Sequence, residues 1–177
     1  FDAVFVGTGA GLPHFMNIPG ENLNGVYSAN EFLTRCNLMK AYRFPDFATP
    51  IHVGRGVAVV GGGNTAVEEA LYIANIANTV TLIHRRDSFR AEKIMVDKLM
   101  QRVEEGKIIL KLNSSVDEIL GDESGVTGAR LKHNDGSTEE IAVKGVFSAI
   151  GHKPNTDIFK GQLDMDETGY LKTKGGT

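Results

Sequence analysis

The sequence holds almost no cysteine. Cys36 is the only one among 177 residues, so the chain can form neither an intrachain disulfide nor a Cys-x-x-Cys redox pair of its own. A single thiol suits a reducing compartment, and we expect a cytoplasmic protein. Cys36 falls on the apolar side of a predicted helix, where we expect it to belong to the core.

Long apolar runs and an excess of charge are also missing. No apolar run reaches the roughly 18 residues of a membrane helix, and no charged-then-apolar leader is present. The formal net charge is -3 and the pI is near 6.0. We therefore expect no membrane segment and no general attraction to nucleic acid, so that any basic function must be local.

Both ends look like cuts in a longer chain. The sequence starts at Phe1 and enters an apolar run, 3–6, which as a strand would need neighbours on both sides. It ends in the turn-like stretch 174–177. We expect an excised piece of a larger protein.

Hydrophobic periodicity predicts alternating strands and helices. Ser28 and Glu31 form a capping box before a helix that runs to Met39. Helical spacing predicts a second helix that follows the glycines and ends near Asn78, and a third, capped by Ser88, from Phe89 to about Glu105. Continuous apolar runs predict buried strands at 57–60, 80–83, 108–110 and 146–150.

Three further segments alternate apolar and polar residues between turn sequences, at 116–120, 129–133 and 140–143. Such alternation is typical of an antiparallel meander. The predicted fold class is therefore α/β, a Rossmann-like three-layer domain with a central parallel sheet and an antiparallel β-meander.

Two glycine-rich segments follow strand-like runs, and only the second has the context of a phosphate-binding loop. After 7–11, Pro13 and the lack of helical spacing remove the helix that such a loop needs, so we expect a turn. Gly61, Gly63 and Ala66 fit G-x-G-x-x-A between a buried strand and a helix.

Each small residue of that pattern has its own task. Gly61 permits the sharp turn, Gly63 lets the backbone approach a pyrophosphate, and Ala66 lets helix and strand pack closely. The helix amino terminus then offers unpaired N–H groups to the anion. The prediction is a dinucleotide site, and the alternative is a plain structural turn.

The end of the second strand indicates which dinucleotide. NAD sites usually place a carboxylate there, whereas this chain has His84, Arg85 and Arg86, with Arg90 four residues on. Guanidinium groups bind phosphate strongly, so NADP(H) is predicted. The alternative is a solvated turn in which Asp87 pairs with the arginines.

Two histidines are open to more than one interpretation. His84 could stack on adenine or bond the phosphate, or it could be a strand-end histidine without a ligand role. His152 follows the last predicted strand and would flank a nicotinamide that crosses the strand ends. We predict no catalytic residue and no metal site in the chain.

Three longer motifs resemble the NADPH domain of bacterial thioredoxin reductase: GGGNTAVEEA (61–70), HRRDSFRAEK (84–93) and AIGHKPNT (149–156). The resemblance covers about 55–177 and implies an FAD flavoprotein in which NADPH passes hydride to flavin and electrons then reach a disulfide. It implies that the nucleotide is held near its pyrophosphate and ribose by Gly61, Gly62, Gly63, Asn64, Thr65, Ala66 and Glu68. Arg85, Arg86 and Arg90, with His84 beside them, would hold the 2'-phosphate, and Ile150 and Gly151 would line the nicotinamide end.

The first 52 residues depart from that pattern. The stretch 44–49 lacks the Cys-x-x-Cys of thioredoxin reductases, and GAGLP (9–13), NIPGEN (17–22) and NLMKAY (37–42) resemble the small subunit of NADPH-dependent glutamate synthase. That resemblance implies FAD and NADPH without a dithiol, and electrons that pass to iron-sulfur clusters.

Both resemblances imply an NADPH domain inserted into an FAD domain. We therefore expect an FAD-domain crossing strand and helical linker at 1–54, an NADP(H)-binding domain at 55–151 and the start of a return into the FAD domain at 152–177. FAD, a redox acceptor protein and a homodimeric state would belong to the parent protein. The alternatives are a glutamate-synthase-like electron-input domain and a non-catalytic NADP(H)-binding fragment.

Overall fold

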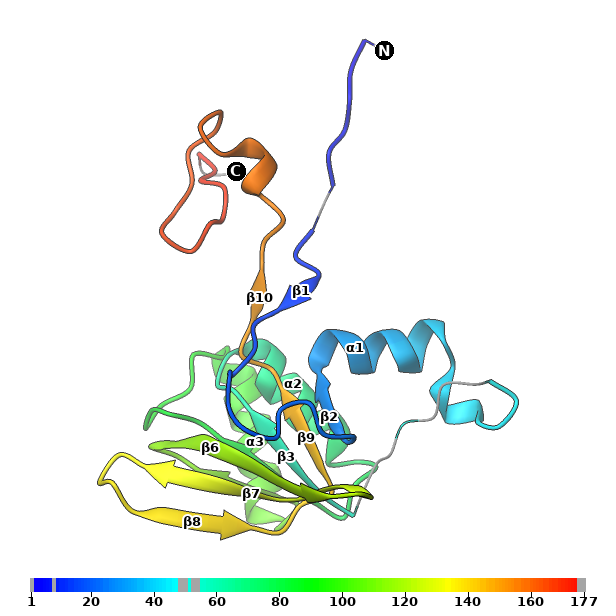
Figure 1. Cartoon of the computed structure of the whole chain (residues 1–177). Coiled ribbons are helices and arrows are strands. Elements are labelled where there is room, and N and C mark those ends of the chain that lie inside the picture. The colour runs from blue at the N-terminus through cyan, green and yellow to red at the C-terminus, as the bar shows by residue number, and fades with distance from the viewer. Residues whose placement is uncertain (1, 8, 48–50, 52–54, 175–177) are drawn as a thin grey trace. The chain divides into compact units, whose positions relative to one another are not determined.

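A computed structural model describes residues 2–7, 9–47, 51 and 55–174 (Figure 1). Parts of the predicted glycine turn (Thr8), the connection after Phe44 (48–50), the lead-in to the first buried strand (52–54) and the tail (175–177) lie outside these residues. The chain divides into two compact units, Phe1–His14 with Gly151–Thr177 and Phe15–Ile150. The predicted functional boundaries near 54 and 151 stay predictions.

The larger unit is built on a five-stranded parallel sheet. Its strand order is β2-β9-β3-β4-β5, and every neighbouring pair runs parallel. The strands are β2 Val26–Ser28, β9 Gly145–Ser148, β3 Gly56–Val60, β4 Thr79–Ile83 and β5 Ile108–Lys111. All four predicted buried strands are confirmed within a few residues, and β2 is the one that the sequence did not reveal.

Two layers cover the two faces of this sheet (Figure 1). Helices α1 (Ala29–Leu33), α2 (Asn64–Ile73) and α3 (Lys93–Glu104) pack with the strand residues Val57, Val59 and Phe147. The antiparallel strands β6 (Ser114–Asp122), β7 (Gly125–His133) and β8 (Thr138–Ile141) form the other layer, which packs on Ala58, Val60 and Val146. Successive strand residues thus serve opposite cores. The predicted α/β three-layer class and the meander are confirmed.

The first helix keeps its predicted cap but not its regular form. Ser28 Oγ accepts a hydrogen bond from Glu31 N at 3.2 Å, as the capping box requires. After α1 the chain widens into a π-helix, Thr34–Leu38, in which Met39 N donates to Thr34 O, and a 3-10 turn, Ala41–Arg43, follows. The prediction of one α-helix to Met39 was therefore wrong after Leu33.

The third helix begins later than predicted. Ser88 does not cap it, because α3 starts at Lys93 with Glu92 in the N-cap position. The residues before Lys93 are drawn into other contacts: Ser88 O accepts from His84 Nε2, and Arg90 N donates to Gly62 O. Tertiary hydrogen bonds therefore replace the first predicted turns of this helix. The second helix also ends early, at Ile73, and continues to Ala77 as hydrogen-bonded turns.

The smaller unit contains two short strands and no α-helix among its described residues. β1 (Leu12–Pro13) pairs antiparallel with β10 (His152–Lys153), and a 3-10 turn covers Asp157–Phe159. The run 3–6 forms no described strand, and Phe5 is 96% exposed. That strand prediction was wrong, since an extended run becomes a strand only with a partner. No helix follows 9–11 among the described residues of this unit.

Over the described residues, no helix combines the length and the apolar character needed to cross a membrane.

A buried carboxyl lies on the inner side of α2. Glu69 is only 6% exposed, and its Oε2 atom has no hydrogen-bond partner among the described residues. Burial, together with the neighbouring charge of Glu68, raises the Glu69 pKa to about 7. The folded state therefore holds this proton more tightly than the unfolded state does.

We expect Glu69 to make the protein less stable as the pH rises. Below pH 4.5, the ordinary value, the group is protonated in both states, and its cost appears as the pH rises to about 7 and is then constant. Glu69→Gln should remove up to about 3 kcal/mol of this pH-dependent loss in unfolding free energy. Urea titrations of both proteins from pH 4.5 to 8 measure it.

Glu104→Gln, an exposed change on α3, is the matched control and should leave the pH profile as in the wild type. Parallel profiles for wild type and Glu69→Gln would contradict the raised pKa.

Candidate functional site

The glycine loop, defined as Gly61–Asn64, begins where β3 ends. Gly61 has a φ of +148°, and a Cβ there would lie 2.5 Å from Ala149 O and 2.7 Å from the Ala66 Cβ. Its N–H donates to Ile83 O at 3.0 Å. A side chain at this position would collide with the backbone after β9 and with α2, so the turn depends on glycine.

The amino terminus of α2 is open on its outer side. Gly63 is the N-cap residue, no side chain caps the helix, and a Cβ on Gly63 would meet nothing within 4 Å. Asn64 and Thr65 are exposed, whereas Ala66 is fully buried. The first turn therefore presents uncapped N–H groups at a surface with room for an anion.

Exposed cations lie on the arginine loop, defined as His84–Glu92, which leaves the carboxyl end of β4. Arg85, Arg86 and Arg90 are all exposed. None of the three forms an ion pair with a described carboxylate, and Asp87 instead accepts a hydrogen bond from Ser88 Oγ. The alternative of a turn in which Asp87 pairs with the arginines thus lacks its ion pair.

The backbone of the arginine loop is fixed at several points. Arg90 N donates to Gly62 O at 2.8 Å, and Arg86 O accepts from Asn113 N at 3.2 Å. The backbone at Arg90 is therefore held at the glycine loop, and the backbone at Arg86 is held at Asn113. The exposed side chains of this loop suit an anion, since guanidinium groups form charge-assisted bonds to phosphate.

His84 contacts both the glycine loop and the arginine loop. It is 8% exposed, its Nε2 donates to Ser88 O at 3.0 Å, and its ring stacks on Phe89 with centroids 5.5 Å apart. A Cβ on Gly62 would lie 2.2 to 2.5 Å from the ring. Burial, with a smaller contribution from the arginine charges, lowers the His84 pKa.

Of the two interpretations of His84, the contacts favour the one without a direct ligand role. The middle glycine, Gly62, also gains a task here, because only glycine leaves room for the ring. The sequence pattern assigns no role to that position, and no signal in it links residues 62 and 84.

The other residues expected at the site are more dispersed. Glu68 is exposed on α2, and Ile150 is 40% exposed immediately after Ala149, whose N–H donates to Val60 O. Gly151 belongs to the smaller unit, where it has a φ of +108° and its carbonyl accepts from His14 N at 3.0 Å. His152 lies in that unit as well, on β10.

The single thiol is placed as predicted, against the core. Cys36 is half-buried and packs on the helix-side core. Burial raises its pKa, and the charge of Glu69 adds to the effect. A raised thiol pKa lowers the fraction of reactive thiolate at neutral pH.

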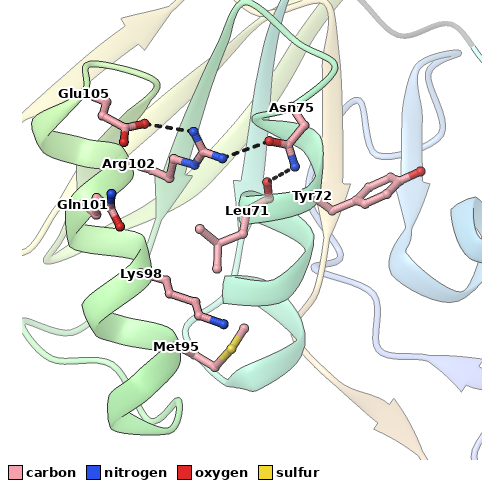
Figure 2. Close-up of a pocket in the computed structure, with 8 residues that line it drawn as sticks. All are labelled: Leu71, Tyr72, Asn75, Met95, Lys98, Gln101, Arg102 and Glu105. Carbon is pink, nitrogen blue, oxygen red and sulfur yellow. Dashed lines mark hydrogen bonds and ion pairs between the residues drawn. The ribbon is translucent and has the colours of Figure 1, made fainter.

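A groove runs between α2 and α3 (Figure 2), and the residues that line it from the first of these helices belong to its last turn. It has a volume of about 490 Å³ and is lined by Leu71, Tyr72, Asn75, Met95, Lys98, Gln101, Arg102 and Glu105. Arg102 bonds both Glu105 and Asn75, and the Asn75 amide donates to Leu71 O. Arg102, Glu105 and Asn75 are thus bonded within the groove.

Comparison with known proteins identifies the family of this chain. Residues 1–176 match the pyridine nucleotide-disulphide oxidoreductases. The chain belongs to this family. The predicted resemblance of residues 1–52 to a glutamate synthase subunit stays a prediction.

Several individual proteins are similar to this chain. Over 99% of its length the chain is 54% identical to the glucosaminate ammonia-lyase of Pseudomonas fluorescens and 45% identical to the thioredoxin reductase of Coxiella burnetii, of which it covers 50% and 51%. The solved thioredoxin reductase of Giardia duodenalis matches with a TM-score of 0.70 at 35% identity, over 90% of this chain and 47% of that one. The chain spans about half the length of the curated relatives it matches. The predicted resemblance to thioredoxin reductases is confirmed.

Two glycines of the loop should respond differently to an added methyl group. Gly61→Ala meets backbone and should lower the unfolding free energy by about 1–3 kcal/mol. Gly63→Ala meets no protein atom, so it should cost less than about 1 kcal/mol of stability. If a pyrophosphate approaches this open side of the loop, the added methyl group should also weaken NADPH binding by about tenfold or more.

Denaturant unfolding and calorimetric titration of both variants measure this contrast. A Gly63→Ala protein that binds NADPH as the wild type does would show that the nucleotide does not approach the loop on this side.

Proposed function

We propose that this chain is the NADP(H)-binding part of an FAD-dependent oxidoreductase of the thioredoxin reductase kind. The observation that carries the proposal is an uncapped helix amino terminus joined, through the bond from Arg90 N to Gly62 O, to a loop with three arginines that form no ion pair with a described carboxylate. One anion site suits the pyrophosphate of any dinucleotide, whereas the second suits a phosphate that only NADP(H) carries.

The residues present fit the nucleotide. Gly61, Gly62 and Gly63 let the backbone approach, and the N–H groups of Asn64, Thr65 and Ala66 would face the pyrophosphate. Arg85, Arg86 and Arg90 would hold the 2'-phosphate, with Glu68 toward a ribose and Ile150 and Gly151 toward the nicotinamide. When bound, NADPH supplies a hydride from its nicotinamide ring.

The role of this chain in that reaction is to bind and orient. The helix amino terminus and the arginines fix the adenine half of the nucleotide at two charged points, so the nicotinamide end is left to extend past the carboxyl ends of β3 and β9. No titrating group of the chain takes part in the step that we propose. The hydride acceptor is a flavin held by the FAD domain of the parent protein.

The final electron acceptor is proposed from the relatives' names. Since relatives of this chain are thioredoxin reductases, we propose a thioredoxin-like disulfide as acceptor and a homodimeric parent. Cys36 is the only cysteine of the chain, so the redox-active cysteine pair has to lie elsewhere in the parent.

A binding module without turnover is the second candidate, and the exposure of the site at the surface of one unit favours it for this chain alone. The two differ in one measurement. Mixed with NADPH and an artificial electron acceptor, the chain should not decrease the absorbance of NADPH, whereas the parent flavoprotein should. Oxidation by the chain alone would contradict the proposed division of labour. Release of ammonia from glucosaminate, the activity that one relative's name states, would instead favour a lyase.

Removing two guanidinium groups should reduce the preference of the site for NADPH over NADH. For Arg85→Ala/Arg86→Ala we expect NADPH affinity to fall by roughly tenfold to hundredfold, because two charge-assisted phosphate bonds are lost. NADH affinity should change little, since NADH lacks that phosphate. Calorimetric titration with each nucleotide gives both values.

Arg102→Ala removes an arginine from the distant α2–α3 groove and serves as the matched control, with both affinities expected at wild-type values. Equal losses of NADH and NADPH in the double variant would refute the assignment of the 2'-phosphate.

A further inference from the structure

We infer that Asn64 is a specificity-determining positioning residue, which ties the glycine loop to the arginine loop and so fixes the arginines at the distance that the 2'-phosphate requires. The inference rests on the proposed function. It assigns to Asn64 a task different from the pyrophosphate contact that the family resemblance implies.

Two hydrogen bonds join the loops in register. Arg90 N donates to Gly62 O at 2.8 Å, and Glu92 N donates to Asn64 Oδ1 at 2.7 Å. Each bond spans 28 residues of sequence, and the second lies two residues beyond the first on both loops. They form two rungs of a short ladder between segments that run in the same direction.

The second hydrogen bond uses a side chain as acceptor because the backbone of the glycine loop has become helical at Asn64. Asn64 is the first residue of α2, so its carbonyl points along the helix and is no longer available to a neighbouring segment. Its amide side chain takes over as acceptor. Glu92 is the N-cap of α3 and has no side-chain cap of its own, so this bond also fixes where α3 begins.

Arg90 forms the first rung and lies two residues before the second. Its own N–H makes the first, and the N–H two residues later makes the second. Without the Asn64 acceptor, the segment after Arg90 loses its only bond from Glu92 N to the glycine loop among the described contacts. Arg90 would then occupy a wider range of positions, and its phosphate bond would carry a larger ordering cost.

A direct ligand role and a positioning role predict different results. The pyrophosphate is common to NADH and NADPH, so loss of a direct contact would weaken both nucleotides equally. The 2'-phosphate belongs to NADPH alone, so loss of the link would weaken NADPH more. The ratio of the two dissociation constants therefore separates the roles.

The experiment compares Asn64→Ala, Asn64→Asp and the control Asn75→Ala by calorimetric titration with both nucleotides, and follows amide hydrogen exchange at Glu92 without nucleotide. For Asn64→Ala we expect the preference for NADPH over NADH to fall by about threefold to tenfold, the effect of one hydrogen bond, and Glu92 N–H to exchange faster. Asn64→Asp keeps an acceptor for Glu92 N and should keep slow exchange there, while its negative charge weakens the binding of both nucleotides. Asn75→Ala, the same substitution just past the other end of α2, should leave both the preference and the exchange unchanged.

Equal weakening of both nucleotides in Asn64→Ala, or Glu92 exchange at the wild-type rate in that variant, would overturn the inference. A wild-type chain without any preference for NADPH would overturn the proposed function and this inference together. The two failures are distinguishable, because the first is seen in a variant of a selective protein and the second in the wild type.

Discussion

The site depends on the close meeting of three backbone segments at Gly61. The end of β3, the residue after β9 and the start of α2 approach so closely that no side chain fits between them. Because Gly61 N also bonds Ile83 O at the end of β4, one small residue sets the relative positions of three strand ends and a helix amino terminus. The positions of both proposed anion subsites therefore depend on Gly61.

The layers around the sheet follow from elementary patterning. Alternate residues of the central strands serve the helix side and the meander side, and each side is closed by its own hydrophobic cluster. Glu69 is the exception, a carboxyl on the helix side without a bonding partner for its Oε2 among the described residues. Fold and site thus share α2, whose inner side packs the core while its amino terminus faces the proposed ligand.

The features that could be predicted from the sequence are those that depend on residues close together in the chain. The buried strands, the meander and the cap at Ser28 follow from periodicity and from short-range capping chemistry, and Gly61 and Ala66 follow from a compact motif. The sequence did not reveal contacts between distant residues. The His84 ring against Gly62, and the bond from Glu92 to Asn64, join residues more than 20 positions apart, and the same contacts explain why α3 begins at Lys93 and not near Ser88. Strand 3–6 failed for a related reason, since its partners had to be assumed.

The ladder between the two loops also limits how the nucleotide preference of such a site could be altered. An arginine loop taken from another protein would have to place N–H groups at the same two acceptors, Gly62 O and Asn64 Oδ1. It would also need a ring that fits against Gly62, as His84 does. Without these contacts the glycine loop would lose its support. Evolution or design can therefore exchange side chains at positions 85, 86 and 90 while the backbone stays in place. The whole arginine loop can be exchanged only together with Gly62 and Asn64, so the two loops form a single structural unit.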